Sequence, residues 1–481
     1  MKKLKGGIVV IVFLISLLAV ISPVSSNGAP PVVWVDDNGP DNGYDHFDTI
    51  GEGISAVATG GTVYVAAGTY NEHLGISTKN LSLIGDGATV TTINGSSGGH
   101  PTITVSTGVT VNISNLTITG ATGMNGNGIF YSNSSGTVRN NTIMGNAQNG
   151  IYVFHCSPTI RNNTITGNSA DGIYNNSNCD TIITDNVITG NTHSGIYNYS
   201  FCDPLITNNT ITGNTHNGIY NFSSCDPLIT NNTITGNTHN GIYNFSSCDP
   251  LITNNVIAGN TQSGIVNFQA CNPMITNNTI TGNTVDGIRN IGSSGCNPTI
   301  TNNIVSSNIS RGISDNGTGA PICTYNNVWG NGVCPADNYY NALPSVGSIS
   351  QDPQLDATYH LTGSSPCIDA GIDTGLVYTD MDGDSRPQGS GIDIGADEYL
   401  QLGINPIAAF LPLANYHLAE ANALLADVEG QLPEDVPKDT QDLLDKVQMH
   451  INNANTTGNT IYANNELLKA IELLEQVLAQ L

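Results

Sequence analysis

Apolar residues recur along this chain with a period of 22 or 23 residues. A Gly-Ile pair marks each period, and its isoleucines are Ile151, Ile173, Ile196, Ile219, Ile242, Ile265 and Ile288. Two consecutive stretches, Asp203–Cys225 and Asp226–Cys248, are identical. A unit this short cannot bury its own apolar side, so the units must stack on one another.

Within a repeat, apolar and polar residues alternate as they do in short strands. The alternation places Ile206 and Ile211 inside and Thr210 and Thr212 outside. Asn and Gly, which tolerate positive φ, separate the strands. The pattern predicts a parallel β-helix of about a dozen coils, an all-β solenoid in which equivalent residues form ladders. One such ladder is an inward row of asparagines that includes Asn209, Asn232 and Asn278.

Changes in composition divide the chain into five segments. Residues 27–80 hold the N-terminal cap and first coil, with Ile50, Ile54 and Val57 on one face of a short capping helix. The repeats fill residues 81–324, and irregular last coils follow in 325–400. Leu, Ala, Glu and Gln dominate residues 404–481, where helical spacing predicts a three-helix module.

The first 26 residues have the pattern of a secretory signal peptide. Basic residues are followed by an apolar run from Ile8 to Ile21 and then by small residues such as Ser26. The run is short for a spanning helix, so the alternative is an uncleaved N-terminal anchor. Export to the cell surface or the medium is therefore expected, with membrane contact only through an uncleaved signal segment.

The formal net charge of −26 narrows the range of partners. A strongly acidic chain does not bind nucleic acid or anionic membrane through its own field. Acidic residues cluster outside the repeats, which are nearly uncharged.

Several segments resemble a known family. The stretches GGTVYVAAGTYNE (Gly60–Glu72) and LSLIGDG (Leu81–Gly87), with the NxIxxN…GI repeats, resemble the right-handed β-helix repeats of the pectin-lyase-like superfamily. The DMDGDSRP…DIGADE run (Asp380–Glu398) resembles the choice-of-anchor element of secreted β-helix surface proteins. The resemblance implies a right-handed β-helix, and polysaccharide lyase or hydrolase activity in its enzyme members.

The chain departs from those enzyme members in its candidate catalytic residues. The paired Asp motifs, Gly-His-Gly and Arg-Ile-Lys of polygalacturonase-type members are missing, and Lys79 is the only lysine of the solenoid. Arg139 and Arg161 stack on adjacent coils and, with His155, are the fallback catalytic residues; Arg289 and Arg311 mark a second irregular region. Whether the protein is an enzyme stays open. The missing catalytic motifs favour a protein that is not an enzyme.

Aromatic residues form the best candidate binding surface. The residue after each Gly-Ile pair points outward, and a second aromatic position follows two residues later. The candidate carbohydrate-binding residues are Tyr152, Tyr174, Tyr197, Tyr220, Tyr243, Phe222, Phe245 and Phe268. Such rings could stack on sugars, because they offer flat apolar area at low entropy cost. They could equally stack on one another and cover the sheet, or pack under a loop or another subunit.

Cysteines and histidines also recur once per coil. Cys156, Cys179, Cys202, Cys225, Cys248 and Cys271 repeat every 23 residues, which favours a buried row of free thiols over adjacent-coil disulfides or a metal site. Cys334 and Cys367 lie outside the repeats and are better disulfide candidates. His193, His216 and His239 stack as well, but no carboxylate or thiol accompanies their row.

Aspartates at alternate positions around a glycine are the strongest indication of a metal-binding site in the sequence. In Asp380-x-Asp382-Gly383-Asp384, the spacing is typical of short loops that wrap Ca²⁺ with oxygen ligands. Because no EF-hand glutamate follows, Asp393, Asp397 or Asp369 would have to complete the shell. The alternative is an acidic turn tied to Arg386.

The sequence therefore leaves three functions open. The favoured one is an exported, non-catalytic surface protein that binds a polysaccharide or cell-surface glycan, or mediates adhesion, through the aromatic face. The second is a polysaccharide lyase or glycoside hydrolase. The third is a structural spacer that presents the helical tail to a partner of unknown kind.

Overall fold

The structure is a computed structural model that describes residues 28–400, except 37–40, 97 and 293–294, together with Val447. The predicted signal peptide lies outside the described residues, and so does the predicted three-helix module apart from Val447. In the part of the chain that is described, no helix is long and apolar enough to cross a membrane.

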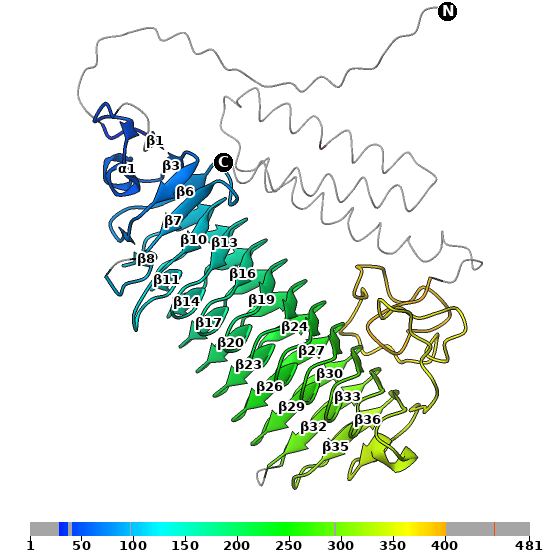
Figure 1. Cartoon of the computed structure of the whole chain (residues 1–481). Coiled ribbons are helices and arrows are strands. Elements are labelled where there is room, and N and C mark those ends of the chain that lie inside the picture. The colour runs from blue at the N-terminus through cyan, green and yellow to red at the C-terminus, as the bar shows by residue number, and fades with distance from the viewer. Residues whose placement is uncertain (1–27, 37–40, 97, 293–294, 401–446, 448–481) are drawn as a thin grey trace, which may run out of the picture.

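Three parallel sheets wind around one core and run the length of a straight solenoid (Figure 1). They contain 14, 12 and 12 strands, which confirms the predicted parallel β-helix of about a dozen coils. Each coil contributes one strand to each sheet, and every strand pairs with its equivalents in the coils before and after.

Strand bounds follow the repeat. The 14-stranded sheet A contains, in spatial order, β2 (His46–Phe47), β1 (Val32–Val35), β3 (Gly61–Val65), β6 (Leu81–Gly85), β9 (Val111–Ser114), β12 (Thr137–Arg139), β15 (Thr159–Arg161), β18 (Ile182–Thr184), β21 (Leu205–Thr207), β24 (Leu228–Thr230), β27 (Leu251–Thr253), β30 (Met274–Thr276), β33 (Thr299–Thr301) and β36 (Ile322–Thr324). Sheet B contains β4 (Gly68–Tyr70), β7 (Thr91–Asn94), β10 (Thr117–Thr119), β13 (Thr142–Met144), β16 (Thr164–Thr166), β19 (Val187–Thr189), β22 (Thr210–Thr212), β25 (Thr233–Thr235), β28 (Val256–Ala258), β31 (Thr279–Thr281), β34 (Ile304–Ser306) and β37 (Asn327–Trp329). Sheet C contains β5 (Leu74–Ile76), β8 (Ile103–Ser106), β11 (Ile129–Ser132), β14 (Ile151–Phe154), β17 (Ile173–Asn176), β20 (Ile196–Tyr199), β23 (Ile219–Phe222), β26 (Ile242–Phe245), β29 (Ile265–Phe268), β32 (Ile288–Ile291), β35 (Ile313–Asp315) and β38 (Tyr339–Tyr340).

The turns between sheets use the left-handed backbone region. Asn208 (φ 56°) turns sheet A into sheet B, and Gly213 (φ 63°) turns sheet B toward sheet C. The turn from sheet C to sheet A differs from the prediction, which placed Asn or Gly at every turn. Two serines, Ser223 and Ser224, have positive φ there. A non-glycine residue there costs about 1–2 kcal/mol. Hydrogen bonds from both backbone N–H groups to the next coil offset the strain.

Ladders of polar side chains run through the core beside the ladders of buried isoleucines. Ile206 and Ile211 are fully buried, as predicted, and so are the asparagines of the predicted ladder. Each buried amide donates to the Oδ1 atom of the next coil, for example from Asn209 to Asn232 at 3.0 Å. Two further ladders were not predicted, one through Asn214 and Asn237 and one through Asn198, Asn221 and Asn244. Stacking is what satisfies these buried amides.

The cysteine row faces the core. Cys179, Cys202, Cys225, Cys248 and Cys271 are fully buried, and all ten cysteines are free. The backbone N–H of Cys202 donates to Sγ of Cys225 at 3.3 Å, a contact repeated along the row. The predicted row of buried free thiols is confirmed except that Cys156 is only half-buried. The suggested disulfide role of Cys334 and Cys367 is wrong, because both are free.

One helix lies at the N-terminal end of the described coils. Helix α1 (Ile50–Ala56) begins after Thr49, whose Oγ1 accepts a hydrogen bond from the N–H of Glu52 at 3.3 Å. It packs on sheet A through Gly53, where a Cβ would lie 2.8 Å from a methyl carbon of Val35. Its role as a cap stays a prediction.

After β38 the chain follows an irregular path that we call the closing segment (residues 341–399). It returns along the solenoid and docks on sheet B, as the yellow and orange trace of Figure 1 shows. Asn302 at a turn of the solenoid binds both backbone groups of Ile372, and Ala396 packs on Val256 and Ala258. Val256 and Ala258 replace outward threonines of other repeats, which is the sequence signal for this covered face. A single 3-10 turn, η1 (Pro335–Asn338), precedes β38.

Replacement of Asn232 by Ala should destabilise the solenoid strongly. Its amide nitrogen makes three hydrogen bonds and its Oδ1 atom accepts two, and all but the partly buried bond to the carbonyl of Thr230 are buried. At about 1 kcal/mol for each bond, the loss should be on the order of 3 kcal/mol or more. Denaturant unfolding checks this result. The control is Thr210→Ala on the exposed side of the same coils, and equal effects would contradict a structural role for the ladder.

Thiol reactivity should distinguish the buried row from the other cysteines. In the native protein, Ellman's reagent should react quickly with exposed Cys334, slowly with half-buried Cys156, and not with the eight buried thiols. In denaturant without reductant all ten thiols should react, because none is in a disulfide. Fewer than ten would show that coils are cross-linked.

Candidate functional site

The predicted aromatic residues form two adjacent columns on the outer side of sheet C, which we call the aromatic face. The first column is Phe130, Tyr152, Tyr174, Tyr197, Tyr220 and Tyr243; the second contains Phe154, Tyr199, Phe222, Phe245 and Phe268. Asn176 interrupts the second column between Phe154 and Tyr199. The register of sheet C thus brings together all eight residues that the sequence indicated.

Rings of the first column stack on one another almost face to face. The centroids of Tyr197 and Tyr220 lie 4.7 Å apart with planes 6° from parallel, and Tyr220 and Tyr243 lie 5.2 Å apart at 13°. In the second column Phe222 and Phe245 lie 4.9 Å apart at 7°. Because each ring covers its neighbour's face, a ligand approaching the columns meets ring edges and tyrosine hydroxyls. This arrangement disfavours sugar stacking on ring faces within the columns.

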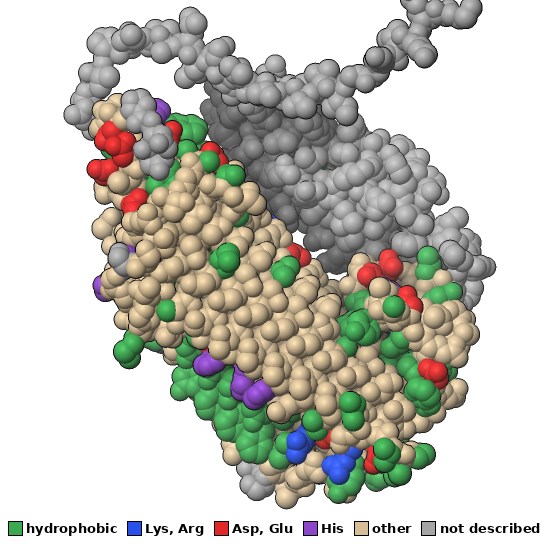
Figure 2. Space-filling model, viewed as in Figure 1, with side chains coloured by type: hydrophobic (Ala, Val, Ile, Leu, Met, Phe, Trp, Pro, Cys, Tyr) green, Lys and Arg blue, Asp and Glu red, His purple; other side chains and the backbone are tan. Residues whose placement is uncertain are grey.

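The columns are half-buried, and they leave a band of apolar surface on the solenoid (Figure 2). Burial and the neighbouring phenol of Tyr243 raise the pKa of Tyr220 to about 12, and burial likewise raises the pKa of Tyr152. The hydroxyls therefore stay protonated at any physiological pH and can donate hydrogen bonds.

A row of histidines borders this band, seen in purple in Figure 2. The rings of His216 and His239 lie 4.2 Å apart, and His216 lies 6.4 Å from the ring of Tyr220. Burial and the neighbouring imidazoles lower the pKa of His216. His216 is thus mainly neutral at pH 7.

Of the fallback catalytic residues, the two arginines lie on sheet A, and His155 lies at the edge of the aromatic face. Arg139 and Arg161 stack on sheet A through the pairing of β12 with β15, and His155 forms a turn with its ring against Phe154. Among the described residues, neither arginine pairs with a carboxylate. Their stacking is as predicted, but no acid–base arrangement accompanies it.

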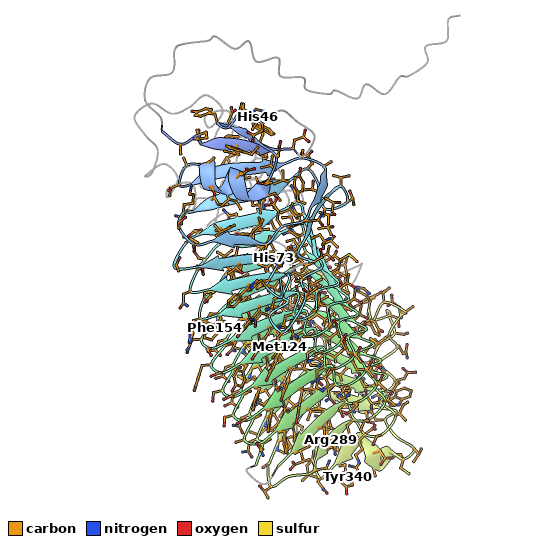
Figure 3. All side chains as sticks on the ribbon, turned by 60° about the vertical axis from the view of Figure 1, so that its left-hand side comes forward. His46, His73, Met124, Phe154, Arg289 and Tyr340 are labelled. Carbon is orange, nitrogen blue, oxygen red and sulfur yellow. The ribbon has the colours of Figure 1, made fainter. Side chains whose placement is uncertain are left out.

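One acid–arginine contact does occur on sheet C, beyond the end of the first column. The carboxylate of Asp286 is buried, and one of its oxygens lies 3.9 Å from Nε of Arg289. That oxygen accepts the hydroxyl of Ser314, whereas its other oxygen has no partner among the described residues. Nearby in sequence, the guanidinium of Arg311 lies 3.5 Å from the ring centre of Tyr340; Figure 3 shows Arg289 and Tyr340 at the same end of the solenoid.

The predicted calcium ligands lie in the closing segment, and backbone groups occupy two of them. Asp380 accepts the N–H groups of Asp382, Asp384 and Glu398, and its burial raises its pKa to about 6. Asp393 accepts the N–H groups of Asp369 and Tyr399. Asp382 and Asp384 remain exposed. The alternative was an acidic turn tied to Arg386. The acidic turn is present, but Arg386 forms its ion pair with Glu398, at 2.8 Å. Calcium binding stays a prediction.

Comparison with known proteins defines the class of fold. Residues 194–346 match the family described as right handed beta helix region, and residues 54–245 match the family described as periplasmic copper-binding protein (NosD). With the three sheets above, these matches establish a right-handed parallel β-helix. The choice-of-anchor resemblance stays a prediction. A comparison with curated proteins finds no match.

Solved structures similar to this chain share its fold. The catalytic domain of a GH87 alpha-1,3-glucanase in complex with tetrasaccharides superposes with a TM-score of 0.51 at 15% identity, covering 68% of each chain. A mannuronan C-5 epimerase A-module of Azotobacter vinelandii gives a TM-score of 0.47 at 18% identity, covering 61% of this chain and 92% of its own. Pectate lyase Pel9A gives 0.46 at 17%, covering 76% and 96%.

Copper does not fit the span that matches NosD. Among the described residues of the whole chain, one group brings three His, Cys, Asp or Glu ligand atoms within 4.8 Å of one another, and it consists of His360, Asp382 and Asp397. That group lies outside residues 54–245. The thiols within the span are buried except for the half-buried Cys156, and among the described residues the stacked histidines belong to no group of three potential ligands.

Alkaline titration should reveal the coupling of the tyrosine column to folding. In the unfolded chain Tyr220 loses its proton near pH 10, and in the folded protein at about 12. Because the unfolded state then binds fewer protons, this residue should lower the stability as pH rises from 10 to 12. Denaturant midpoints measured across that range should fall less steeply for Tyr220→Phe. An unchanged slope would contradict the burial of this hydroxyl.

Proposed function

We propose that this chain is an exported, non-catalytic protein that binds an extended polysaccharide along the aromatic face. The observation that carries the proposal is the unbroken first column, in which six rings repeat at steps of 4.7 to 5.2 Å. This step is comparable to the length of one sugar residue in an extended glycan. A strand lying along the solenoid axis would therefore present similar groups to each coil.

Binding would rely on many similar contacts rather than on one pocket. Ring edges offer apolar contact to the C–H groups of a sugar, and tyrosine hydroxyls and the bordering imidazoles offer hydrogen bonds. An exposed apolar band with a polar border is typical of an interaction surface. Since each coil repeats the same weak site, affinity should rise with glycan length.

The charge of the chain bears on which glycan it would bind. With a net charge of −26, the protein repels polyanions at long range, and the aromatic face carries no cationic row to offset this. A neutral polysaccharide or cell-surface glycan is therefore the preferred partner over an acidic one. The fold is also one on which the GH87 glucanase binds tetrasaccharides.

Export rests on two supports. The first 26 residues have the pattern of a signal peptide, and the family matched by residues 54–245 is described as periplasmic. The compartment beyond the cytoplasmic membrane would give the aromatic face access to glycans. In the third alternative the solenoid is a spacer that presents the predicted helical tail to its partner.

The enzyme alternative has one observation in its favour. The buried Asp286 and the partly exposed Arg289 form an incompletely hydrogen-bonded acid–arginine contact beyond the end of the first column, one coil past Val266. Unpaired buried polar atoms of this kind occur at functional sites. A glycan held on the aromatic face would reach this contact, so a lyase or hydrolase would have its catalytic groups there rather than at Arg139 and Arg161.

Substitution of the column should separate these functions. In Tyr197→Ala/Tyr220→Ala/Tyr243→Ala, retention of long neutral glycans on a glycan array should fall by at least tenfold, because three adjacent contacts are removed together. The matched control is Thr189→Ala/Thr212→Ala/Thr235→Ala, which changes the equivalent coils on sheet B.

Three other results would count against the proposal. Equal loss in the threonine control would show that the substitutions act through folding, which circular dichroism would reveal. New unsaturated or reducing sugar ends that depend on Asp286 would establish the enzyme alternative. An array with no retained glycan would favour the spacer.

A further inference from the structure

The closing segment holds a cluster of potential ligands that three separate loops bring together. After β38 the described residues of this segment form no helix or strand, and two isolated bridges join Leu355 to Leu361 and Thr379 to Ser385. His360 lies within the first bridged loop, Asp382 within the second and Asp397 near the end of the segment, and their ligand atoms converge. Their spacing in the sequence follows no motif, so only the fold assembles them.

The geometry of the cluster is that of a ligand set around a small cation. Nε2 of His360 lies 2.8 Å from Oδ2 of Asp382, and the ligand atoms of all three residues lie within 4.8 Å of one another. Nitrogen and oxygen ligands lie about 2.0–2.2 Å from a tetrahedral Zn²⁺, so two of its ligand atoms are roughly 3.4 Å apart. The contact between His360 and Asp382, at 2.8 Å, is shorter than this, and the exposed Asp382 side chain can rotate to open the space for an ion.

Hydrogen bonding fixes the orientation of the imidazole and its tautomer. The hydroxyl of Thr358 must donate to Oδ1 of Asp356, at 2.8 Å, because a carboxylate only accepts. Nδ1 of His360, 2.8 Å from the same hydroxyl oxygen, must then carry a proton and donate it. The neutral ring therefore directs the lone pair of Nε2 at a carboxylate oxygen. That contact is repulsive unless a positive charge, either a second proton or a metal ion, lies there.

Asp397 supplies a buried carboxylate with ligand capacity left over. The residue is 6% exposed, and one of its oxygens accepts the N–H of Leu361 at 2.7 Å. Its other oxygen has no hydrogen-bond partner among the described residues. Burial and the nearby charge of Asp382 raise the pKa of Asp397, with the backbone hydrogen bond and His360 opposing them. Two carboxylates and one imidazole make an electrostatically unbalanced group that a divalent cation would neutralise.

We propose that His360, Asp382 and Asp397 bind one divalent transition-metal ion of the zinc, cobalt or manganese class. Such an ion accepts one imidazole nitrogen and two carboxylate oxygens, whereas Ca²⁺ prefers a shell of six to eight oxygens. The ion joins three loops that have no sheet to hold them together. Thr358 and Asp356 are positioning residues, because they set the ring through Nδ1.

Metal titration of the full chain tests this site. After treatment with a chelator and its removal, calorimetric titration with Zn²⁺ and Co²⁺ should give one saturable equivalent, with Co²⁺ also developing visible absorption. Binding should raise the thermal unfolding temperature, since the ion binds only the folded arrangement of loops. His360→Ala and Asp397→Asn should each weaken binding at least tenfold and remove that increase.

Two matched controls separate this site from other acidic groups. His46→Ala removes a histidine at the N-terminal end of the solenoid (Figure 3) that contacts Asp45 at 2.9 Å, and Asp384→Asn changes the acidic turn without changing the three ligands. Both variants should bind the metal like the original protein. Asp397→Asn keeps the size of the side chain, so its apo form should unfold at a similar temperature to the original.

Several outcomes would overturn the proposal. Absence of saturable Zn²⁺ or Co²⁺ binding would show that a second proton on His360 forms an ion pair with Asp382 instead. Equal binding by the original protein and by His360→Ala would place the metal elsewhere. Saturable Ca²⁺ binding that is lost in Asp384→Asn, without binding of Zn²⁺, would assign the acidic turn to calcium.

Discussion

Register between successive coils is the constraint on which the rest of this structure depends. A slip of one residue would turn the buried isoleucines outward and the threonines inward. The same register places each buried asparagine over the next, so that amides costly to bury alone hydrogen-bond as columns. The asparagine ladders therefore satisfy the polar core and, because they pair only in one alignment, they also select the register.

A repeating register also limits the chemistry that the surface can perform. Every side chain on a regular coil has an equivalent above and below it, so rows such as the tyrosines or histidines define no unique position. Such rows suit the binding of a repeating polymer, which is what the proposed function requires. Unique arrangements occur only where the repeat breaks, as at Asp286 and Arg289 or in the closing segment. Catalysis or specific metal binding should therefore be sought at those places.

The sequence predicted some parts of the candidate sites and not others. The two aromatic columns followed from alternation and the period, since in a solenoid one repeat in sequence is one step in space. Only the structure, which gives the angles between the ring planes, shows that the rings cover one another's faces. In the closing segment, the predicted ligands Asp380 and Asp393 are occupied by backbone N–H groups. His360, 22 residues before Asp382, carried no signal of its place beside it.

The sequence by itself determined the coil, the sheet in which each repeat residue lies, and the inward or outward direction of its side chain. The physical reason is that contacts between coils are nearest-neighbour contacts at a fixed spacing, so the period encodes them. The tertiary structure alone decided which segment covers sheet B at Val256 and Ala258, which carboxylates backbone N–H groups occupy, and which residues of the closing segment converge. Those contacts join residues at irregular separations along the chain, and no local pattern records which loop will lie against another.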